Sequence, residues 1–221
     1  KILAIAPHPD DEVLGLGGTM AKFSGSGHSV SVLTCTKVFA PEFDEEISVV
    51  SRQEAKNAHR LLGVNESIFL DFPVLDLNSA GHVKINNAIS EVLEDVKPDV
   101  LFIPFLGDIH VDHKWLFNAA LVAARPISSY APKKILSYET LSETEWSAPY
   151  LETNFVPNVF IDIEDFLDLK LQAMSEFKSQ IRDFPHPRSK PALESLARFR
   201  GSHVSMKAAE AFVLIRDIIN F

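Results

Sequence analysis

The chain has a single cysteine, an excess of acidic over basic residues and no long hydrophobic run, and each shortage excludes a class of protein. Cys35 has no partner for an internal disulfide, which favours a reducing compartment, and the cytoplasm is the expected location. With 21 Lys and Arg against 30 Asp and Glu, the net charge of −9 argues against a nucleic-acid-binding protein. No apolar run approaches the ~20 residues of a membrane span, and Ile2–Ala6 is too short for a signal peptide.

What the sequence does contain is an alternation of short apolar segments and longer amphipathic ones. The apolar segments predict strands at Ile2–Ala6, Val30–Thr34, Ser67–Leu70, Val100–Pro104 and Lys134–Ser137. The amphipathic segments predict helices at about Leu14–Ser24, Glu45–Leu62, Ile85–Val96 and His110–Ala124. This alternation predicts a Rossmann-like α/β fold, with an open, mostly parallel sheet and helices on both faces.

The last third of the chain is less regular. Its patterns predict a strand at Phe155–Ile161, a long helix at Asp165–Gln180, a second helix at Pro191–Gly201 and a final apolar run at Phe212–Ile218. The proline-rich loop 183–191 could be a lid over a substrate or a subunit contact. The length favours a single domain over residues 1–221, with a tail from about residue 151 folded onto it.

Two groups of histidines and carboxylates follow predicted strands. "HPDDE" (His8–Glu12) comes after the first strand, and "GDIHVDH" (Gly107–His113) comes after the strand at Val100–Pro104. Ligands of open parallel sheets bind beyond the carboxyl ends of the strands, so we expect both groups at one rim. Together they supply the imidazoles and carboxylates that zinc or a similar divalent metal takes as ligands.

Each group has a simpler explanation when it is considered alone. Asp10 or Asp11 could cap the helix that begins near Val13. His110 and His113 could be first-turn residues of a helix with no ligand at all. Two such groups at strand ends of one domain are much less expected by chance than either group alone. The metal interpretation therefore depends on the pair.

The glycines after the first group do not indicate a dinucleotide site. Gly15, Gly17 and Gly18 resemble that fingerprint, but Met20 stands where its third glycine should be. The acidic residues Asp10–Glu12 would also repel a pyrophosphate at this turn. We expect the glycines to permit close packing of the helix on the sheet.

Four segments together resemble the LmbE-like deacetylases, which include the N-acetylglucosaminylphosphatidylinositol de-N-acetylases (PIG-L). They are "APHPDDEVLGLGG", "SRQEAKNAHRLLG", "GDIHVDH" and "RGSHVSMKAAEAF", and they span most of the chain. The resemblance implies a Rossmann-like sheet and zinc-dependent removal of the acetyl group from an N-acetylated amino sugar. One departure is Val111, which stands where the family often has proline and could change the stiffness of the loop.

The resemblance also implies roles for individual residues. His8, Asp11 and His113 would bind the metal, which is zinc or alternatively Fe²⁺ or Co²⁺. Three protein ligands leave zinc a fourth position for water, whose pKa the metal lowers. Asp10 would be the general base, and His110 would face the substrate carbonyl.

Further residues are candidates for supporting roles. Asp112 or Asp108 could keep His110 charged, so that an imidazolium donates to the oxyanion, or could simply cap the next helix. On the resemblance, Arg52 could reach the rim and contact a sugar hydroxyl or the amide oxygen, or be solvated. His203 could approach the pocket. Glu12 is the next candidate for the base if Asp10 is not the base, and the remaining histidines, His28, His59, His82 and His186, are expected to be surface or packing residues.

Three functions stay open at this point. The first is a zinc-dependent deacetylase of an N-acetylated amino sugar (GlcNAc-type) or its conjugate, and the second is a hydrolase of another small acyl amide. The third is a non-catalytic metal- or sugar-binding module, against which Asp10 argues, because such a module needs the ligands but not the base. The resemblance also favours a homo-oligomer.

Overall fold

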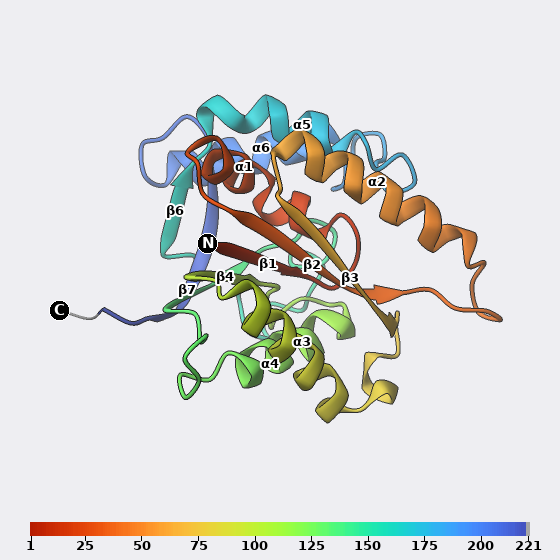
Figure 1. Cartoon of the computed structure of the whole chain (residues 1–221). Coiled ribbons are helices and arrows are strands. Elements are labelled where there is room, and N and C mark those ends of the chain that lie inside the picture. The colour runs from red at the N-terminus through yellow and green to blue at the C-terminus, as the bar shows by residue number, and fades with distance from the viewer. Residues whose placement is uncertain (220–221) are drawn as a thin grey trace.

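The computed structural model describes residues 1–219 and arranges them as one sheet between two layers of helices (Figure 1). The strands are β1 (Ile2–Ala6), β2 (Val30–Lys37), β3 (Glu66–Pro73), β4 (Val100–Ile103), β5 (Lys134–Tyr138), β6 (Val159–Asp162) and β7 (Ala209–Asp217). The helices are α1 (Asp11–Gly25), α2 (Glu46–Leu62), α3 (His82–Val96), α4 (Val111–Ala123), α5 (Leu167–Met174) and α6 (Lys190–Ser202), with short 3₁₀ turns η1 (Leu77–Ala80) and η2 (Glu164–Phe166). The predicted Rossmann-like α/β fold is confirmed.

The order of strands determines where a ligand can bind. The order is β3-β2-β1-β4-β5-β7-β6; β7 pairs antiparallel with both β5 and β6, and the other pairs among the described strands are parallel. The central strand β1 pairs in parallel with β2 on one side and with β4 on the other, so that Ala4 lies between Val32 and Phe102. The chain order reverses at this point, and the carboxyl ends of β1 and β4 border the crevice where such sheets bind ligands.

Each face of the sheet has its own apolar core. Figure 1 shows α1, α2, α5 and α6 over one face and α3 with α4 over the other. Side chains alternate along β1, so that Ile2 and Ala4 pack in the first core and Leu3 and Ile5 in the second. Burial on both faces explains why the central strands have near-continuous apolar sequences.

Helix α1 is interrupted by a buried ion pair. Leu16 has φ −146° and ψ 24°, which is not helical. The amide of Gly18, which in a continuous helix would donate to the carbonyl of Leu14, donates to Glu210 instead. Lys170 Nζ donates to the carbonyl of Leu14 at 2.8 Å and to Glu210 at 2.6 Å. Lys170 and Glu210 therefore take the places of the missing helical partners.

The glycines of α1 permit close packing, as their positions in the sequence predict. A Cβ atom at Gly15 would overlap the ring of Tyr138 on β5. One at Gly18 would lie 2.8 Å from the side chain of Ile163. Larger residues at either position would push α1 away from the elements that carry the site.

The last third of the chain departs from the prediction. The long helix predicted at Asp165–Gln180 is wrong, because α5 ends at Met174. The hydroxyl of Ser175 donates back to the carbonyl of Leu171, and Phe177 is fully buried, so the chain turns inward to place this ring in the core.

The C-terminal strands also differ from the expected tail. β7 pairs between β5 and β6, so this part of the chain extends the sheet instead of only lying over it. A single domain over the whole chain stays a prediction. Within residues 1–219, no helix has the length and apolar character needed to cross a membrane.

Candidate active site

Three of the predicted ligands meet beyond the carboxyl ends of β1 and β4. His8 follows β1, Asp11 opens α1 and His113 lies in the first turn of α4. Oδ2 of Asp11 lies 3.1 Å from Nδ1 of His8 and 3.3 Å from Nε2 of His113. One potential ligand atom from each residue lies within 4.8 Å of the others, so a single metal ion can contact all three.

Buried polar atoms without partners support a metal at this place. Among the described residues, Oδ1 of Asp11 and Nε2 of His113 are buried and form no hydrogen bond. Because buried polar atoms are nearly always paired, these two atoms are available as ligands. Two imidazoles and one carboxylate suit zinc, and they also accept Fe²⁺ or Co²⁺.

Protons compete with a metal for the same atoms. Burial lowers the pKa of His8, but hydrogen bonds to Asp11 and Asp112 outweigh it and raise this pKa to about 9. His113 is buried as well, and the charges of Asp11 and Asp108 raise its pKa to about 10. The two imidazoles in turn hold the pKa of Asp11 well below its usual range, although burial raises it. A metal that binds here must displace protons.

Asp108 orients His113. Its Oδ2 atom lies 2.7 Å from Nδ1 of His113, and its Oδ1 atom accepts a hydrogen bond of 2.6 Å from the hydroxyl of Thr144. With Nδ1 engaged, Nε2 of His113 faces Asp11. Hydrogen bonds of this kind fix the tautomer and direction of a metal ligand.

The carboxylate of Asp112 hydrogen-bonds with His8 and not with His110, the partner that the sequence analysis predicted. Its Oδ2 atom lies 3.1 Å from Nε2 of His8 and accepts from the amide of Leu75 at 2.8 Å, whereas Nδ1 of His110 lies 3.9 Å away. His8, His110 and Asp112 also place one potential ligand atom each within 4.8 Å of one another. However, Nδ1 of His110 is already occupied, because it accepts from the amide of Asp112 at 3.1 Å.

His110 is neutral, which corrects the expectation of an imidazolium. Burial, followed by repulsion from His8 and His113, lowers the pKa of His110 to about 4. Because Nδ1 accepts a hydrogen bond, the ring proton is on Nε2. A neutral His110 still offers one N–H donor to a ligand.

Asp10 has a strained backbone that a buried network holds. Its φ of 113° is rare for a residue with a side chain and costs about 1–3 kcal/mol. Its amide donates to Glu12, whose other oxygen lies 3.0 Å from Nε2 of His59, and Nδ1 of His59 lies 2.7 Å from the hydroxyl of Ser67. Glu12 is fully buried within this network and is therefore not available as an alternative base.

The carboxylate of Asp10 faces a guanidinium that the sequence analysis missed. Oδ2 of Asp10 lies 3.4 Å from Arg188, which also lies 3.4 Å from Glu143 and donates to Ser142 at 2.7 Å. Burial raises the pKa of Asp10 well above its usual range, and the charge of Arg188 opposes this shift. Arg188 belongs to the proline-rich loop 183–191, so this loop reaches the site.

A cavity of about 220 Å³ opens onto these residues. Its lining includes His8, Asp10, His110 and Arg188, together with Arg52. The structure thus places Arg52 at the rim, as predicted, where its guanidinium donates to Asp71 at 2.7 Å.

His203 lies outside this cavity, against the expectation. It is exposed at the end of α6, with its ring 4.6 Å from that of Phe199 and 6.0 Å from that of Phe160. The segment that contains His203 resembles a segment of the family, but this resemblance did not predict where the His203 side chain lies.

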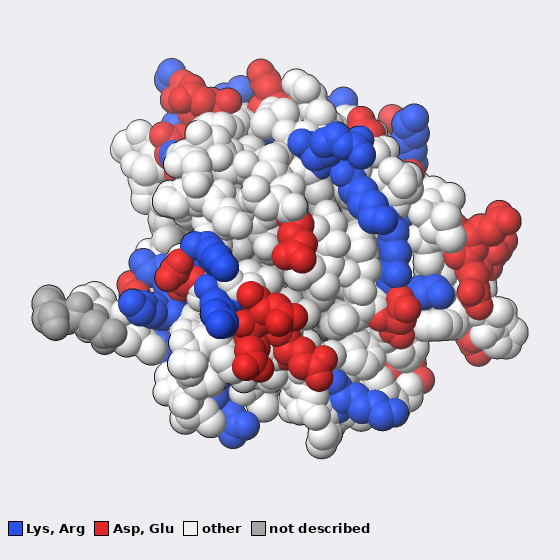
Figure 2. Space-filling model, viewed as in Figure 1, with Lys and Arg blue, Asp and Glu red and all other residues white. Residues whose placement is uncertain are grey.

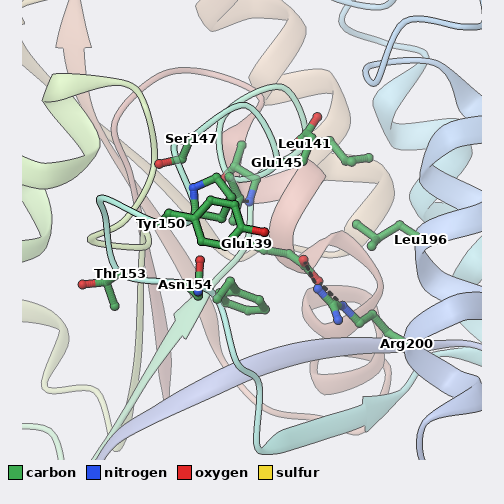
Figure 3. A pocket seen from close by; sticks show the side chains of 13 residues that line it. Glu139, Leu141, Glu145, Ser147, Tyr150, Thr153, Asn154, Leu196 and Arg200 are labelled. Carbon is green, nitrogen blue, oxygen red and sulfur yellow. Dashed lines mark hydrogen bonds and ion pairs between the residues drawn. The ribbon is translucent and has the colours of Figure 1, made fainter.

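A larger cavity, of about 490 Å³, borders segment 139–147 (Figure 3). Glu143 of this segment lines the smaller cavity. Figure 3 shows Arg200 directed at Glu139, with nitrogen–oxygen distances of 2.6 and 2.7 Å. None of the described residues that line the larger cavity is a histidine or cysteine, and its two carboxylates, Glu139 and Glu145, are engaged by Arg200 and by the amide of Ser142. The smaller cavity is the candidate active site.

Comparison with known proteins gives this site a family. Residues 3–124 match the PIG-L family, described as GlcNAc-PI de-N-acetylase. The uncharacterised deacetylase YaiS of Escherichia coli (strain K12) is 28% identical over 187 residues, which cover 80% of this chain and 90% of that protein. Diacetylchitobiose deacetylase of Thermococcus kodakarensis is 26% identical over 228 residues, which cover 99% of this chain and 84% of that protein.

A solved structure agrees with these matches. A conserved protein from Thermus thermophilus superposes with a TM-score of 0.78 at 25% identity, covering 100% of this chain and 96% of that one. The family match spans more than half of the chain and includes both groups of histidines and carboxylates. The chain therefore belongs to the GlcNAc-PI de-N-acetylase (PIG-L) family, the family that its sequence motifs resemble.

Proposed function

We propose that this protein is a zinc-dependent hydrolase that removes the acetyl group from an N-acetylated amino sugar of the GlcNAc type, or from its conjugate. The observation that carries the proposal is the set of buried, unpaired ligand atoms on Asp11 and His113 beside a cavity lined by Asp10 and His110. The deacetylases among the relatives support the reaction, and the ligand set His8, Asp11 and His113 supports zinc.

The residues divide amide hydrolysis among them. Zinc held by His8, Asp11 and His113 would supply Lewis acidity toward the amide carbonyl and the attacking water. Asp10 takes a proton from that water as the water oxygen bonds to the carbonyl carbon. The charge of Arg188, which opposes the upward shift of the Asp10 pKa, favours the carboxylate form that this step needs. Asp10 then gives the proton to the amine as the carbon–nitrogen bond breaks and acetate forms. His110 donates its Nε2–H to the carbonyl oxygen as negative charge develops there.

The lining of the cavity favours a sugar over another acyl amide. Besides the residues that act on the amide, it contains the hydroxyls of Thr36, Ser48 and Ser51 and the amide group of Gln180. Such side chains can exchange hydrogen bonds with sugar hydroxyls. Each of these groups already has a partner within the protein, but their oxygens can accept further hydrogen bonds, which sugar hydroxyls can donate and an apolar acyl amide cannot.

Acetate release tests the proposal directly. We expect the wild-type protein to contain about one zinc per chain and to release acetate from diacetylchitobiose, with chelation abolishing the release and zinc restoring it. Asp10→Asn should retain the metal and lose turnover by about 10²–10⁴-fold. A variant that keeps wild-type turnover would mean that Asp10 is not the base. Metal without acetate release from any N-acetylated sugar would favour the binding module, and release only from other acyl amides would favour the second alternative.

Three expectations about context stay predictions. They are a homo-oligomer, a cytoplasmic location and no binding to nucleic acid. Light scattering on the purified protein tests the first, and retention on immobilised DNA tests the last. Loop 183–191 could be a lid or a subunit contact, and light scattering also bears on this choice, because a subunit contact requires an oligomer.

A further inference from the structure

Helix α2 carries a line of positive charge on one face. Arg52, Lys56 and Arg60 recur every four residues, and we call these three residues the basic strip. Residues at this spacing share a helix face, and a rise of 1.5 Å per residue makes the strip about 12 Å long. Figure 2 shows a continuous line of Lys and Arg over the region where Figure 1 places α2 and β3.

The two charges of the strip that lie farther from the cavity, Lys56 and Arg60, have no acidic partners among the described residues. Lys56 and Arg60 are exposed, and within residues 1–219 neither lies within 4.0 Å of a carboxylate. The acid between Arg52 and Lys56 in sequence, Glu54, is turned inward and accepts hydrogen bonds from Ser179. Arg52 already pairs with Asp71 at 2.7 Å, so the unneutralised part of the strip is Lys56 and Arg60. In a chain with more acidic than basic residues, these two charges are a candidate binding surface for an anion.

The strip is held in place on the sheet. The Arg52 guanidinium and the Lys56 ammonium lie 5.2 and 5.6 Å from the centre of the Phe69 ring. Phe69 belongs to β3, the edge strand of the sheet. These cation–π contacts hold both side chains beside the α2–β3 border, where the Lys56 ammonium stays exposed.

One end of the strip is at the active-site cavity. Arg52 lines the cavity together with Lys37, whose only described carboxylate partner, Glu45, lies 3.8 Å away. A ligand whose acetamido group lies at Asp10 and His110 can therefore extend past Arg52 toward Lys56.

We propose that the basic strip binds the acidic part of an extended substrate, so that the enzyme deacetylates an N-acetylated amino sugar within an acidic oligosaccharide. This inference rests on the function proposed above. Positive charge along the path to the cavity raises the local concentration of an anionic ligand and the rate of encounter. The polar lining of the cavity favours a glycan over a membrane surface, and the net charge of −9 opposes a nucleic acid.

Two substrates of equal length test the inference. They are a hyaluronan tetrasaccharide with GlcNAc at its non-reducing end, which carries carboxylates, and neutral chitotetraose. At low salt we expect kcat/KM for acetate release to be about tenfold higher for the acidic substrate, mainly through a lower KM. In 1 M NaCl, where the Debye length falls to about 3 Å, the two values should converge.

Charge reversal locates the effect. The double variant Lys56→Glu/Arg60→Glu should remove the preference for the acidic substrate and leave kcat/KM for chitotetraose unchanged. The control Lys84→Glu/Lys133→Glu changes the net charge equally at exposed positions on α3 and just before β5, and it should keep the preference. Equal kcat/KM for both substrates in the wild type, or an equal loss for both in the strip variant, overturns the inference.

Binding separates this inference from the proposed function. If the wild type releases acetate from neither substrate but binds the hyaluronan tetrasaccharide by calorimetry through Lys56 and Arg60, the strip is supported and the proposed function fails. If chitotetraose is deacetylated without any salt-sensitive preference, the function stands and the strip fails. Binding of phosphatidylglycerol vesicles that depends on Lys56 and Arg60, with no effect on either oligosaccharide, would assign the strip to a membrane and overturn the proposal.

Discussion

Helix α1 contacts two buried clusters of charge that differ in how fully their polar atoms are paired. At its N-terminus, Asp11 lies between two imidazoles, and both Asp11 and His113 are at most 1% exposed. Near its middle, the Lys170–Glu210 pair is at most 4% exposed. Burial and charge are therefore similar in the two clusters.

Hydrogen bonding distinguishes them. Lys170 donates to Glu210 and to a carbonyl, and the two oxygens of Glu210 also accept from the amides of Gly18 and Thr19. In the other cluster, Asp11 and His113 each keep a buried atom that forms no hydrogen bond among the described residues, although Nε2 of His113 lies 3.3 Å from Oδ2 of Asp11. A fully paired cluster stabilises the fold, whereas an incompletely paired one marks a place where a ligand completes it. Comparing the two clusters teaches that burial of charge alone does not identify a functional site.

Removing a ligand from the incomplete cluster should have the largest effect. We expect His113→Ala to lose the bound metal and to lower acetate release at least about a thousandfold, because metal catalysis contributes several kcal/mol. Elemental analysis and the acetate assay measure both changes, and circular dichroism checks the fold. His82→Ala, at an exposed histidine, is the matched control. Full metal retention in His113→Ala would remove His113 from the ligand set.

Breaking the complete cluster should change stability instead. Lys170→Met leaves Glu210 buried without its cation, which we expect to cost about 3–5 kcal/mol in the free energy of unfolding. Urea denaturation measures this loss, and the folded variant should keep its metal. The double variant Lys170→Met/Glu210→Gln should recover part of the loss, because it removes both charges. If Lys170→Met lost metal at unchanged stability, the distinction between the clusters would fail.

The predictable part of the site is the part that is local in sequence. The alternation of strands and helices predicts that β1 and β4 end at one rim, and the segments His8–Glu12 and Gly107–His113 carry the acidic and imidazole side chains within a few residues of those ends. A metal site at this rim could therefore be proposed without a structure, whereas the individual ligands and the role of Asp10 followed from the family resemblance. The sheet and its helices follow from the same short-range periodicity.

The parts that could not be predicted depend on contacts between distant segments. Arg188 reaches Asp10, and Thr144 reaches Asp108, from loops whose positions no spacing rule determines. The lowered pKa of His110 depends on burial and on two other imidazoles that the fold brings close. The early end of α5 depends on the burial of Phe177, which tertiary packing decides.

The smallest expected effect tests the rim of the incomplete cluster, where Glu143 contacts Arg188. Burial, followed by repulsion from Asp11, raises the pKa of Glu143 from its ordinary 4.5 to about 7. Ionisation therefore favours the unfolded chain, and the wild type loses stability as the pH rises from 4.5 to 7. Glu143→Gln removes this loss, so at pH 8 it should be more stable than the wild type by about 1–2 kcal/mol after solvent screening.

The sign of this pH dependence discriminates between two roles for Glu143. Thermal unfolding of wild type and Glu143→Gln at several pH values should give curves that meet near pH 4.5 and separate up to pH 7. The opposite order at pH 8, with the variant less stable, would mean that the ion pair with Arg188 outweighs burial. The rim would then resemble the fully paired Lys170–Glu210 cluster, and the contrast between the two clusters would be confined to the metal ligands themselves.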